Sequence, residues 1–258
     1  MSRFLSIVIV AAVVVAVATA ASAGVHVSEA SALTGKVWVL AALSGKAPLK
    51  GTELTSEFGA KLHVSGSAGC NRYTGAYKVS GNTIRISTLV TTKKACAAPI
   101  ERQETAFLKA LTGARSFAIK GRSLTVESAG GRTLATFEAQ TQALGGTSWD
   151  VLAYNNGKQA VVSVLTETKL TAVFGTSGSL TGFAGCNDYN ASYKASAPKI
   201  AIGPVASTRK HCEQPAGVSE QETSYLAALE TVATYRVEGS RLELRTTDGA
   251  LAVELHRK

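Results

Sequence analysis

The sequence predicts two copies of a mainly antiparallel β unit (α+β), each of which carries one helix. The first observation is a repeated motif, Ala-Gly-Cys-Asn, which occupies residues 68–71 and returns at residues 184–187. The second is a series of short strand-like segments, separated by turn residues at intervals of about 8–12 residues. This spacing is typical of barrels and sandwiches, and a barrel-like closure leaves no sheet edge unprotected.

The first residues have the layout of a secretory signal peptide. A short basic start, Met1–Arg3, precedes a nearly uninterrupted apolar run, and the small-residue triplet Ala21–Ala23 is typical of a cleavage site. We therefore predict that residues 1–23 are a signal peptide and that no membrane span remains after cleavage. The alternative is a retained membrane anchor, because the apolar run is nearly long enough to cross a bilayer.

The first repeat is predicted to span residues 35–139. Its expected strands are short apolar or alternating segments bounded by turn residues, at 37–40, 61–64, 73–79, 83–87, 116–119, 124–126 and 134–137. Residues 44–57 contain two glycines and a proline and are expected to form a loop. One helix is expected from Ile100 to Leu111, because apolar residues recur there on one face and Gly113 follows as a stop.

The second repeat is predicted to span residues 145–257, after a linker at residues 139–147 that contains a Gly-Gly pair. It presents the same elements in the same order, beginning with a strand at Trp149. The segment from Cys186 to Cys212 aligns with the corresponding segment of the first copy without a gap. Each copy is large enough to form a domain of its own.

The chain has four cysteines, all of which belong to the repeated motifs. An exported protein reaches an oxidising compartment, where disulfides persist. Four cysteines allow three pairings, and the repeat favours Cys70–Cys96 and Cys186–Cys212, each within its own copy. Each bridge would close a loop of about 25 residues and stabilise its copy by about 3 kcal/mol. Zinc is the competing use, but C-x-x-C spacing is missing and only His211 adjoins a cysteine, so no metal site is predicted.

The formal charge of +9 is unevenly distributed. Residues 24–140 carry 15 Lys and Arg against 7 Asp and Glu, whereas residues 141–258 carry 11 of each. A basic first half beside a neutral second half indicates an anionic partner for the first half. The alternative is that the basic charge only keeps a secreted protein soluble. We expect no specific nucleic-acid site.

Several short motifs occur in the same order in both copies. The first copy has Trp38-x-Leu40, Gly69-Cys70-Asn71-x-Tyr73, Thr92-x-x-x-Cys96, Glu104-x-x-Phe107-Leu108 and Leu124-x-Val126. The second has Trp149-x-Val151, Gly185-Cys186-Asn187-x-Tyr189, Thr208-x-x-x-Cys212, Glu222-x-x-Tyr225-Leu226 and Leu242-x-Leu244. This ordered set resembles the META domain, a family that includes the heat-shock protein HslJ. The resemblance implies two small antiparallel β-barrel-like domains, each with one helix, in an exported bacterial protein associated with stress, and it brings no established catalytic residues.

The residues that follow the first cysteine of each copy are the candidate contact residues. They are Asn71, Arg72 and Tyr73 in the first copy, and Asn187, Asp188 and Tyr189 in the second. The structural interpretation is that each asparagine side chain bonds nearby backbone in a tight turn and that each tyrosine belongs to the sheet. The alternative is contact with a ligand. Because Asp188 replaces Arg72, equal binding by both copies is not expected.

No catalytic set accompanies these motifs. Each expected helix carries a glutamate beside its apolar stripe, Glu104 or Glu222, but neither has a partner acid or nucleophile in the pattern. In the second copy, Ser219-x-x-Glu222 matches a capping box, so we expect Glu222 to cap the start of its helix. The sequence lacks the G-x-S-x-G, Walker A, G-x-G-x-x-G and H-E-x-x-H motifs. We therefore expect no catalytic residue and no cofactor.

The expected function is that of an exported, non-enzymatic binding or envelope-stress module, periplasmic or secreted. Its partner would be a protein or an anionic envelope component, met mainly by the basic first domain. The alternative is an inhibitor of a secreted hydrolase or protease, which would present the basic pairs Lys93-Lys94 or Arg209-Lys210 to an active site. A third hypothesis is an enzyme that uses scattered residues at a barrel mouth, because such a site leaves no sequence motif.

Overall fold

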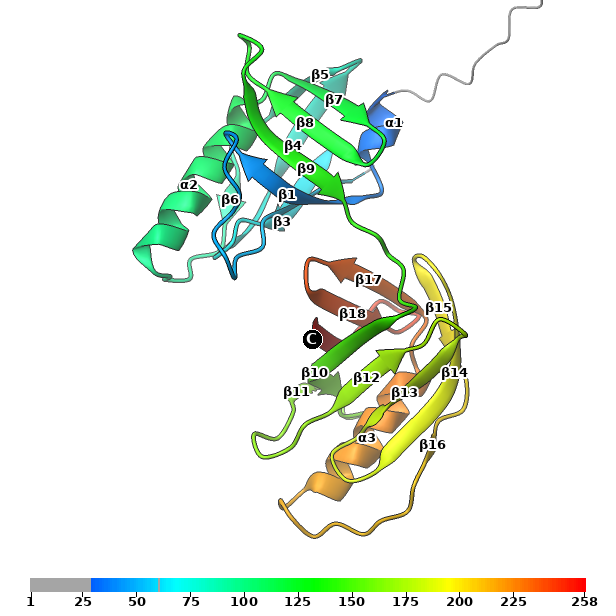
Figure 1. Ribbon diagram of the computed structural model, residues 1–258. Coiled ribbons are helices and arrows are strands. Elements are labelled where there is room, and N and C mark those ends of the chain that lie inside the picture. Colours follow the sequence, from blue (N-terminus) through cyan, green and yellow to red (C-terminus); the bar gives the residue numbers. More distant parts are fainter. Residues whose placement is uncertain (1–28, 60) are drawn as a thin grey trace, which may run out of the picture.

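A computed structural model describes residues 29–59 and 61–258, which fold into two barrels joined by a short linker (Figure 1). The predicted signal peptide, residues 1–23, lies outside the described residues. Within the described part of the chain, no helix is both long enough and apolar enough to cross a membrane.

The first barrel is a closed ring of antiparallel strands with a helix packed against it. Its elements are α1 (Glu29–Leu33), β1 (Val37–Leu43), β2 (Thr55–Phe58), β3 (His63–Ser67), β4 (Arg72–Ser80), β5 (Thr83–Ile86), β6 (Val90–Thr91), α2 (Ala98–Gly113), β7 (Ser116–Lys120), β8 (Ser123–Glu127) and β9 (Thr133–Ala139). The ring runs from β1 through β2, β3, β4, β5, β7 and β8 to β9, which pairs with β1 again. Closure pairs the backbone groups that an open edge would leave free.

The second barrel repeats this plan. Its elements are β10 (Thr147–Asn155), β11 (Val161–Ser163), β12 (Thr171–Phe174), β13 (Ser179–Phe183), β14 (Asp188–Ser196), β15 (Lys199–Ile202), β16 (Ala206–Ser207), α3 (Val218–Glu230), β17 (Thr234–Glu238), β18 (Arg241–Arg245) and β19 (Leu251–Arg257). The pairing of β10 with β19 closes its ring, and β11 and β16 add short pairings outside it. The predicted fold of two antiparallel barrel-like domains with one main helix each is therefore confirmed.

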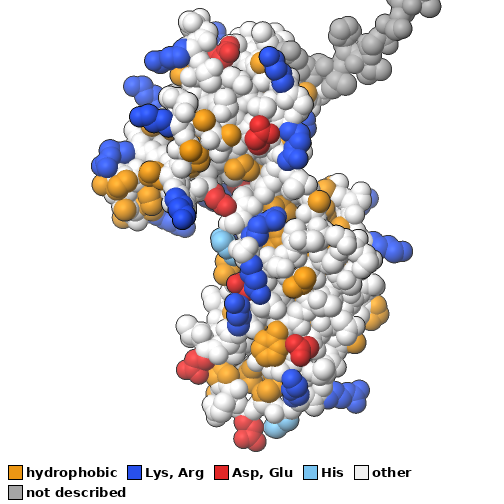
Figure 2. Space-filling model, in the orientation of Figure 1, with side chains coloured by type: hydrophobic (Ala, Val, Ile, Leu, Met, Phe, Trp, Pro, Cys, Tyr) orange, Lys and Arg blue, Asp and Glu red, His pale blue; other side chains and the backbone are white. Residues whose placement is uncertain are grey.

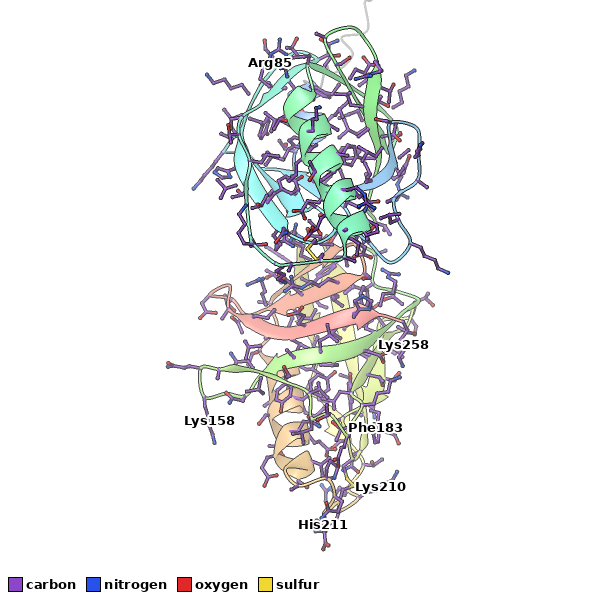
Figure 3. All side chains as sticks on the ribbon, turned by 90° about the vertical axis from the view of Figure 1, so that its left-hand side faces the viewer. Arg85, Lys158, Phe183, Lys210, His211 and Lys258 are labelled. Atoms are coloured by element: carbon purple, nitrogen blue, oxygen red, sulfur yellow. A yellow bond between two sulfur atoms is a disulfide. The ribbon has the colours of Figure 1, made fainter. Side chains whose placement is uncertain are left out.

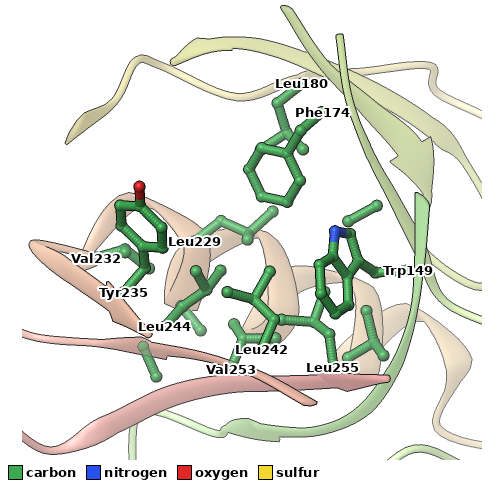
Figure 4. Packing of buried hydrophobic residues seen from close by; sticks show 14 of the residues in the cluster. Trp149, Phe174, Leu180, Leu229, Val232, Tyr235, Leu242, Leu244, Val253 and Leu255 are labelled. Atoms are coloured by element: carbon green, nitrogen blue, oxygen red, sulfur yellow. The ribbon is translucent and has the colours of Figure 1, made fainter. Parts of the chain in front are cut away.

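Each barrel has its own hydrophobic core, and the helix covers it. In the first barrel, Phe107 and Leu111 on α2 are fully buried, and the Phe107 ring lies 5.9 Å from that of Tyr73. In the second, Trp149 and Phe174 point into the interior beside Leu229 of α3 (Figure 4). Full burial of one such large apolar side chain contributes about 1.5–3 kcal/mol, so these residues fix each helix on its barrel.

The expected loop at residues 44–57 is partly wrong, because its last residues begin strand β2. Only Phe58 in this strand is a large apolar residue, and Thr55 and Glu57 face away from the core, so the segment lacks the pattern that predicts a strand. Helix α2 also extends beyond the predicted range at both ends, with Pro99 in its first turn, where a missing N–H costs nothing.

The linker between the barrels is held against β17. The side chain of Gln142 donates to the Val237 carbonyl (2.9 Å) and accepts from the Val237 N–H (2.8 Å). Gln140 pairs in the same way with Gly239, with both distances 2.7 Å. These paired bonds give the linker a defined path along the second barrel instead of leaving it as a free tether.

Candidate functional site

The repeated motif forms a compact junction in each barrel, where the turn after β3 or β13 meets the loop before the helix. The turn needs Gly69 in the first copy and Gly185 in the second, because their φ angles of 98° and 103° lie in the region that favours glycine. The first junction lies at the end of its barrel that faces the second barrel. In the second barrel, Lys210 and His211 mark the junction at the end that points away from the first (Figure 3).

Both disulfides connect the residues that the repeat favours. Cys70 bonds Cys96 with a Cα–Cα separation of 6.2 Å, and Cys186 bonds Cys212 with a separation of 6.0 Å. These separations are ordinary for disulfides. All four cysteines are therefore committed to structural bonds, and the pairs are typical of an oxidising, extracytoplasmic environment.

The side-chain amide of Asn71 holds the disulfide loop in place. Its oxygen accepts hydrogen bonds from the Thr92 hydroxyl and the Lys94 N–H, both at 2.8 Å. Its nitrogen donates to the Lys94 carbonyl (3.3 Å) and to the Glu104 carboxylate (3.0 Å). These bonds use the two donors and two acceptor positions of an amide, so the side chain has no free group for a ligand. The partners lie across the loop and on the helix, not in a tight turn as expected.

Asn187 repeats this network in the second copy with nearly the same distances. Its oxygen accepts from Thr208 (2.6 Å) and from the Lys210 N–H (2.7 Å). Its nitrogen donates to the Lys210 carbonyl (3.1 Å) and to Glu222 (2.9 Å). The asparagine of the motif is thus a structural residue in both barrels.

The capping box predicted for Glu222 is wrong. Helix α3 begins at Val218 after Gly217, no side chain caps it, and Ser219 lies inside its first turn. The Glu222 carboxylate accepts instead from the Asn187 N–H (2.7 Å) and side chain. Glu104 accepts from Asn71 in the same way. Each glutamate therefore joins its helix to the turn that carries the first cysteine.

A second residue on each helix has a similar role, which was not predicted from the sequence. Gln103 accepts from the Leu49 N–H (2.6 Å) and donates to the Thr52 hydroxyl (2.8 Å), which fixes the loop before β2 against α2. Gln221 makes the corresponding bonds to Leu165 and Thr168 (2.8 and 2.9 Å). The signal was present in the sequence, because Gln-Glu-Thr occurs at the same place in both helices.

The tyrosines of the motif are buried sheet residues with different partners. The Tyr73 hydroxyl lies 2.7 Å from Ser56 and 2.9 Å from the Thr55 carbonyl. The Tyr189 hydroxyl bonds the equivalent carbonyl of Thr171 (2.9 Å), but its other partner is the Tyr225 hydroxyl (2.8 Å). Burial raises the pKa of both Tyr73 and Tyr189 well above the ordinary value. Neither hydroxyl is therefore suited to exchange protons with a substrate near neutral pH.

Arg72 and Asp188, which differ between the copies, have different environments. Arg72 Nη2 lies 3.2 Å from the Glu238 carboxylate, so it connects the first barrel to the β17–β18 hairpin of the second (Figure 1). The Thr55 hydroxyl donates to the same carboxylate (2.7 Å), and Glu57 forms an ion pair with Arg236. Asp188 is exposed and forms no ion pair with any residue from 29–59 or 61–258.

Comparison with known proteins agrees with the repeated architecture. The family model of the META domain matches the chain twice, at residues 31–141 and 142–258. The chain belongs to the META domain family. No curated protein matches it.

Solved structures that are similar to the chain each cover just under half of it. An NMR structure of a protein from Burkholderia xenovorans is 25% identical with a TM-score of 0.38, and the match covers 45% of this chain and 83% of that one. A further NMR structure of a protein is 25% identical with a TM-score of 0.36, covering 42% and 92%. A crystal structure of a DUF4847 family protein from Bacteroides vulgatus is 12% identical with a TM-score of 0.33, covering 45% and 94%.

The contact between the two META domains contains a buried charge. Burial alone would raise the pKa of Glu238, but Arg236, the Thr55 hydroxyl and Arg72 together outweigh burial and lower the pKa below its ordinary value. Nearby, the Ser240 N–H donates to Glu53 (2.8 Å). A side chain at Gly239 would meet Glu53, because an added Cβ would lie only 2.0 Å from its carboxylate oxygen. The contact is therefore close-fitting as well as charged.

A crevice of about 470 Å³ lies beside this contact, with walls from both META domains. Its charged lining residues are already engaged: Glu57 pairs with Arg236, and the Lys36 ammonium donates to the Ala32 carbonyl (2.9 Å). Among the residues that the structure describes, no group of three or more His, Cys, Asp and Glu is placed to hold a metal ion.

Proposed function

We propose that this chain is an exported, non-enzymatic binding module, and that the first META domain binds an anionic component of the cell envelope. The contact surface is the basic face of α2, which consists of exposed residues on the helix and on the two loops beside it. These residues are Lys50, Lys93, Lys94, Arg102 and Lys109.

The geometry of α2 supports this assignment. Arg102 and Lys109 are seven residues apart on the helix and therefore lie on the same outward side. Gln103 fixes the loop that carries Lys50 against the helix, through the bond from the Leu49 N–H. The loop that carries Lys94 is held by Asn71 and by the disulfide. The five cations are thus presented on segments with defined positions, which lowers the ordering cost of binding.

The proposal is supported above all by the lack of an internal counter-charge for these cations. Among the described residues of the first domain, Arg72 alone of the basic residues forms an ion pair with a carboxylate. The acidic residues of this domain are partly engaged elsewhere, since Glu57 pairs with Arg236 and Glu104 accepts from Asn71. Figure 2 shows Lys and Arg side chains spread over the first domain with few acidic side chains between them.

The second META domain provides an internal comparison. Glu220 and Ala227 stand on α3 where Arg102 and Lys109 stand on α2, so the outward side of this helix is not basic. Several basic residues of this domain also form ion pairs with carboxylates, as Arg245 does with Glu243 at 2.7 Å. An anionic surface would therefore be attracted to the first domain rather than to the second.

The proposals of export and of a non-enzymatic role are supported by separate features of the molecule. Two disulfides suit a periplasmic or secreted protein. The motif asparagines bond the motif glutamates, and the motif tyrosines bond buried groups of their own barrels, so these side chains serve the fold. A role in envelope stress is the expectation that the resemblance to HslJ carries, and it is consistent with a disulfide-stabilised module that acts by binding.

The test is a binding titration of the full chain without the predicted signal peptide. Phosphatidylglycerol vesicles and a carboxylated polysaccharide serve as the two anionic probes, which distinguishes lipid from polymer. Each basic residue at an anionic surface contributes about 1 kcal/mol, so R102Q/K109Q should weaken binding about thirtyfold. Raising the salt concentration should also weaken the binding of the unmodified chain.

The matched control is K194Q/K199Q, which removes two exposed cations from the second domain. This control should bind almost as well as the unmodified chain. Equal losses in both double variants, or no binding to either probe at low salt, would show that the basic face of α2 is not a binding surface.

A second candidate function is inhibition of a trypsin-like protease. Lys94 is exposed, yet Asn71 binds both its N–H and its carbonyl, and the disulfide of Cys96 lies two residues further on. A rigid exposed loop with a basic residue is what an inhibitor needs in order to occupy such an active site. A panel of secreted proteases would test this, with K94A as the control variant. No inhibition at micromolar concentration would eliminate it.

A further inference from the structure

The contact between the two META domains joins two unlike surfaces. One is the docking patch of the first domain, formed by Thr55, Glu57 and Arg72. The other is the tip of the β17–β18 hairpin, where Arg236 and Glu238 meet that patch. The two partners are repeats of the same domain, so each domain has both kinds of surface. One contact between them therefore leaves one docking patch and one hairpin tip unused.

The unused surfaces follow from the strand register. Arg72 pairs with Ser67 across β3 and β4, and Asp188 pairs with Phe183 across β13 and β14 in the equivalent place. The second domain therefore has its own docking patch, formed by Thr171, Val173 and Asp188. The β7–β8 hairpin of the first domain is equivalent to β17–β18, and its tip presents Ala118 and Lys120.

Both unused surfaces are open to solvent. Val173 and Asp188 are exposed on the second domain, and Ala118 and Lys120 are exposed on the first. Glu238, by contrast, is buried by the contact inside the chain. The docking patch of the second domain and the hairpin tip of the first domain are thus both accessible for a contact of the same kind.

The charges on the unused surfaces are exchanged together. Where the internal contact pairs Arg72 with Glu238, the unused surfaces present Asp188 and Lys120, so the sign of each partner is reversed and the attraction is kept. Reversal of only one partner would have produced repulsion between like charges.

The neighbouring pair changes in the same coordinated way. The internal contact joins Glu57 to Arg236, and the equivalent residues of the unused surfaces are Val173 and Ala118. An ion pair is therefore replaced by two apolar residues, with no unpaired charge left on either side. Thr171 keeps the hydroxyl that Thr55 supplies, and this oxygen is able to accept a hydrogen bond from an ammonium group.

We propose that this chain associates head to tail with a second copy of itself. The docking patch of the second domain receives the β7–β8 hairpin of the next copy, with Asp188 paired to Lys120 and Val173 packed on Ala118. Because the two surfaces are unlike, the contact repeats from copy to copy and produces a row or a closed ring. This association is separate from the anion-binding proposal, because it does not use the basic face of α2.

One internal contact has no counterpart between copies. Glu53 accepts from the Ser240 N–H inside the chain, but Lys169 occupies the equivalent position of the second patch and lies 3.6 Å from Asp150. Lys169 would also approach Arg122, which stands where Ser240 stands. The contact between copies is therefore weaker than the internal one, which the linker also favours by holding the partners together.

The test measures the mass of the full chain without the predicted signal peptide by sedimentation over a range of concentrations. The average mass of the unmodified chain should rise with concentration, and salt should reduce this rise. Either K120E or D188K should weaken association about tenfold. K169E should strengthen it, because it restores an acceptor at the position of Glu53.

The decisive experiment mixes the two single variants. The K120E chain and the D188K chain each repel themselves, but together they place opposite charges at every contact, so the mixture should associate as the unmodified chain does. A variant that had only lost its fold would not be rescued in this way. A single-chain mass for both the unmodified chain and K169E at all concentrations, or failure of the mixture to associate when the unmodified chain does, would overturn the proposal.

Discussion

Glu104 on α2 accepts two hydrogen bonds from Asn71, one from the backbone N–H at 2.7 Å and one from the side-chain amide at 3.0 Å. We predict that Glu104→Gln destabilises the first domain by about 1–3 kcal/mol, because the new amide would direct an N–H group at a donor and leave a partly buried group unsatisfied. Urea unfolding measures this change. Glu138→Gln, at an exposed position of β9, is the control and should change stability by less than about 0.5 kcal/mol.

The disulfides should contribute equally to the two domains, because both close loops with a sequence separation of 26. Replacing Cys70 and Cys96 together with serine should cost about 3 kcal/mol in the first domain. If unfolding is monitored with a separate probe in each domain, the two steps show which domain has lost stability. A loss of the same size in the second domain would contradict the independence of the two bridges.

The hydroxyl of the motif tyrosine bonds a side-chain hydroxyl in both domains, but from different positions. Tyr73 bonds Ser56, and Tyr189 bonds Tyr225. We predict that Ser56→Ala costs about 1 kcal/mol, because Tyr73 loses one partner. Adding Phe107→Tyr should recover part of this loss, since position 107 is equivalent to position 225 and Ser56→Ala leaves room for the new hydroxyl. A double-mutant cycle measures the coupling. Strictly additive effects of the two substitutions would show that a tyrosine at position 107 does not replace the hydrogen bond of Ser56.

Arg72 should fix the relative position of the two domains. Arg72→Ala removes one of the cations that balance the buried carboxylate of Glu238, so the contact should open more often. Small-angle scattering should then report a larger radius of gyration, with each domain still folded by circular dichroism. Lys78→Ala, on the exposed side of the same strand, is the matched control and should leave the radius unchanged.

The contact between the domains should weaken in acid. The pKa of Glu238 is lowered on folding, so its contribution to stability is complete above the ordinary glutamate pKa and is lost as the pH falls through the folded value. Glu238→Gln should therefore be less stable than the unmodified chain near about pH 7, and this difference in unfolding free energy should shrink as the pH falls below the ordinary glutamate pKa. A difference in unfolding free energy that stays constant across this range would contradict the assigned role of the charge.

Several parts of the site were predictable because their signals are local or repeated. The cysteine pairing followed from the equal spacing within each copy, and most strands of the rings and the helices α2 and α3 followed from apolar periodicity. Strand β2 was missed because its outward residues, Thr55 and Glu57, are used by the other domain and carry no alternation that the local sequence explains. Glu222 was misassigned because the Ser-x-x-Glu pattern is local, whereas its true partner, Asn187, lies 35 residues away.

Two disulfide-closed META domains were predictable from the sequence alone, because a duplicated pattern of cysteines, glycines and apolar residues constrains each copy in the same way. The different roles of Arg72 and Asp188, in contrast, became clear from the three-dimensional arrangement of the two barrels. Arg72 and Glu238 are 166 residues apart, and no local pattern connects them. Folding of both barrels brings them together, and the same geometry leaves Asp188 exposed at the far end. A charge acquires its role from the partner that the fold places beside it, not from its neighbours along the chain.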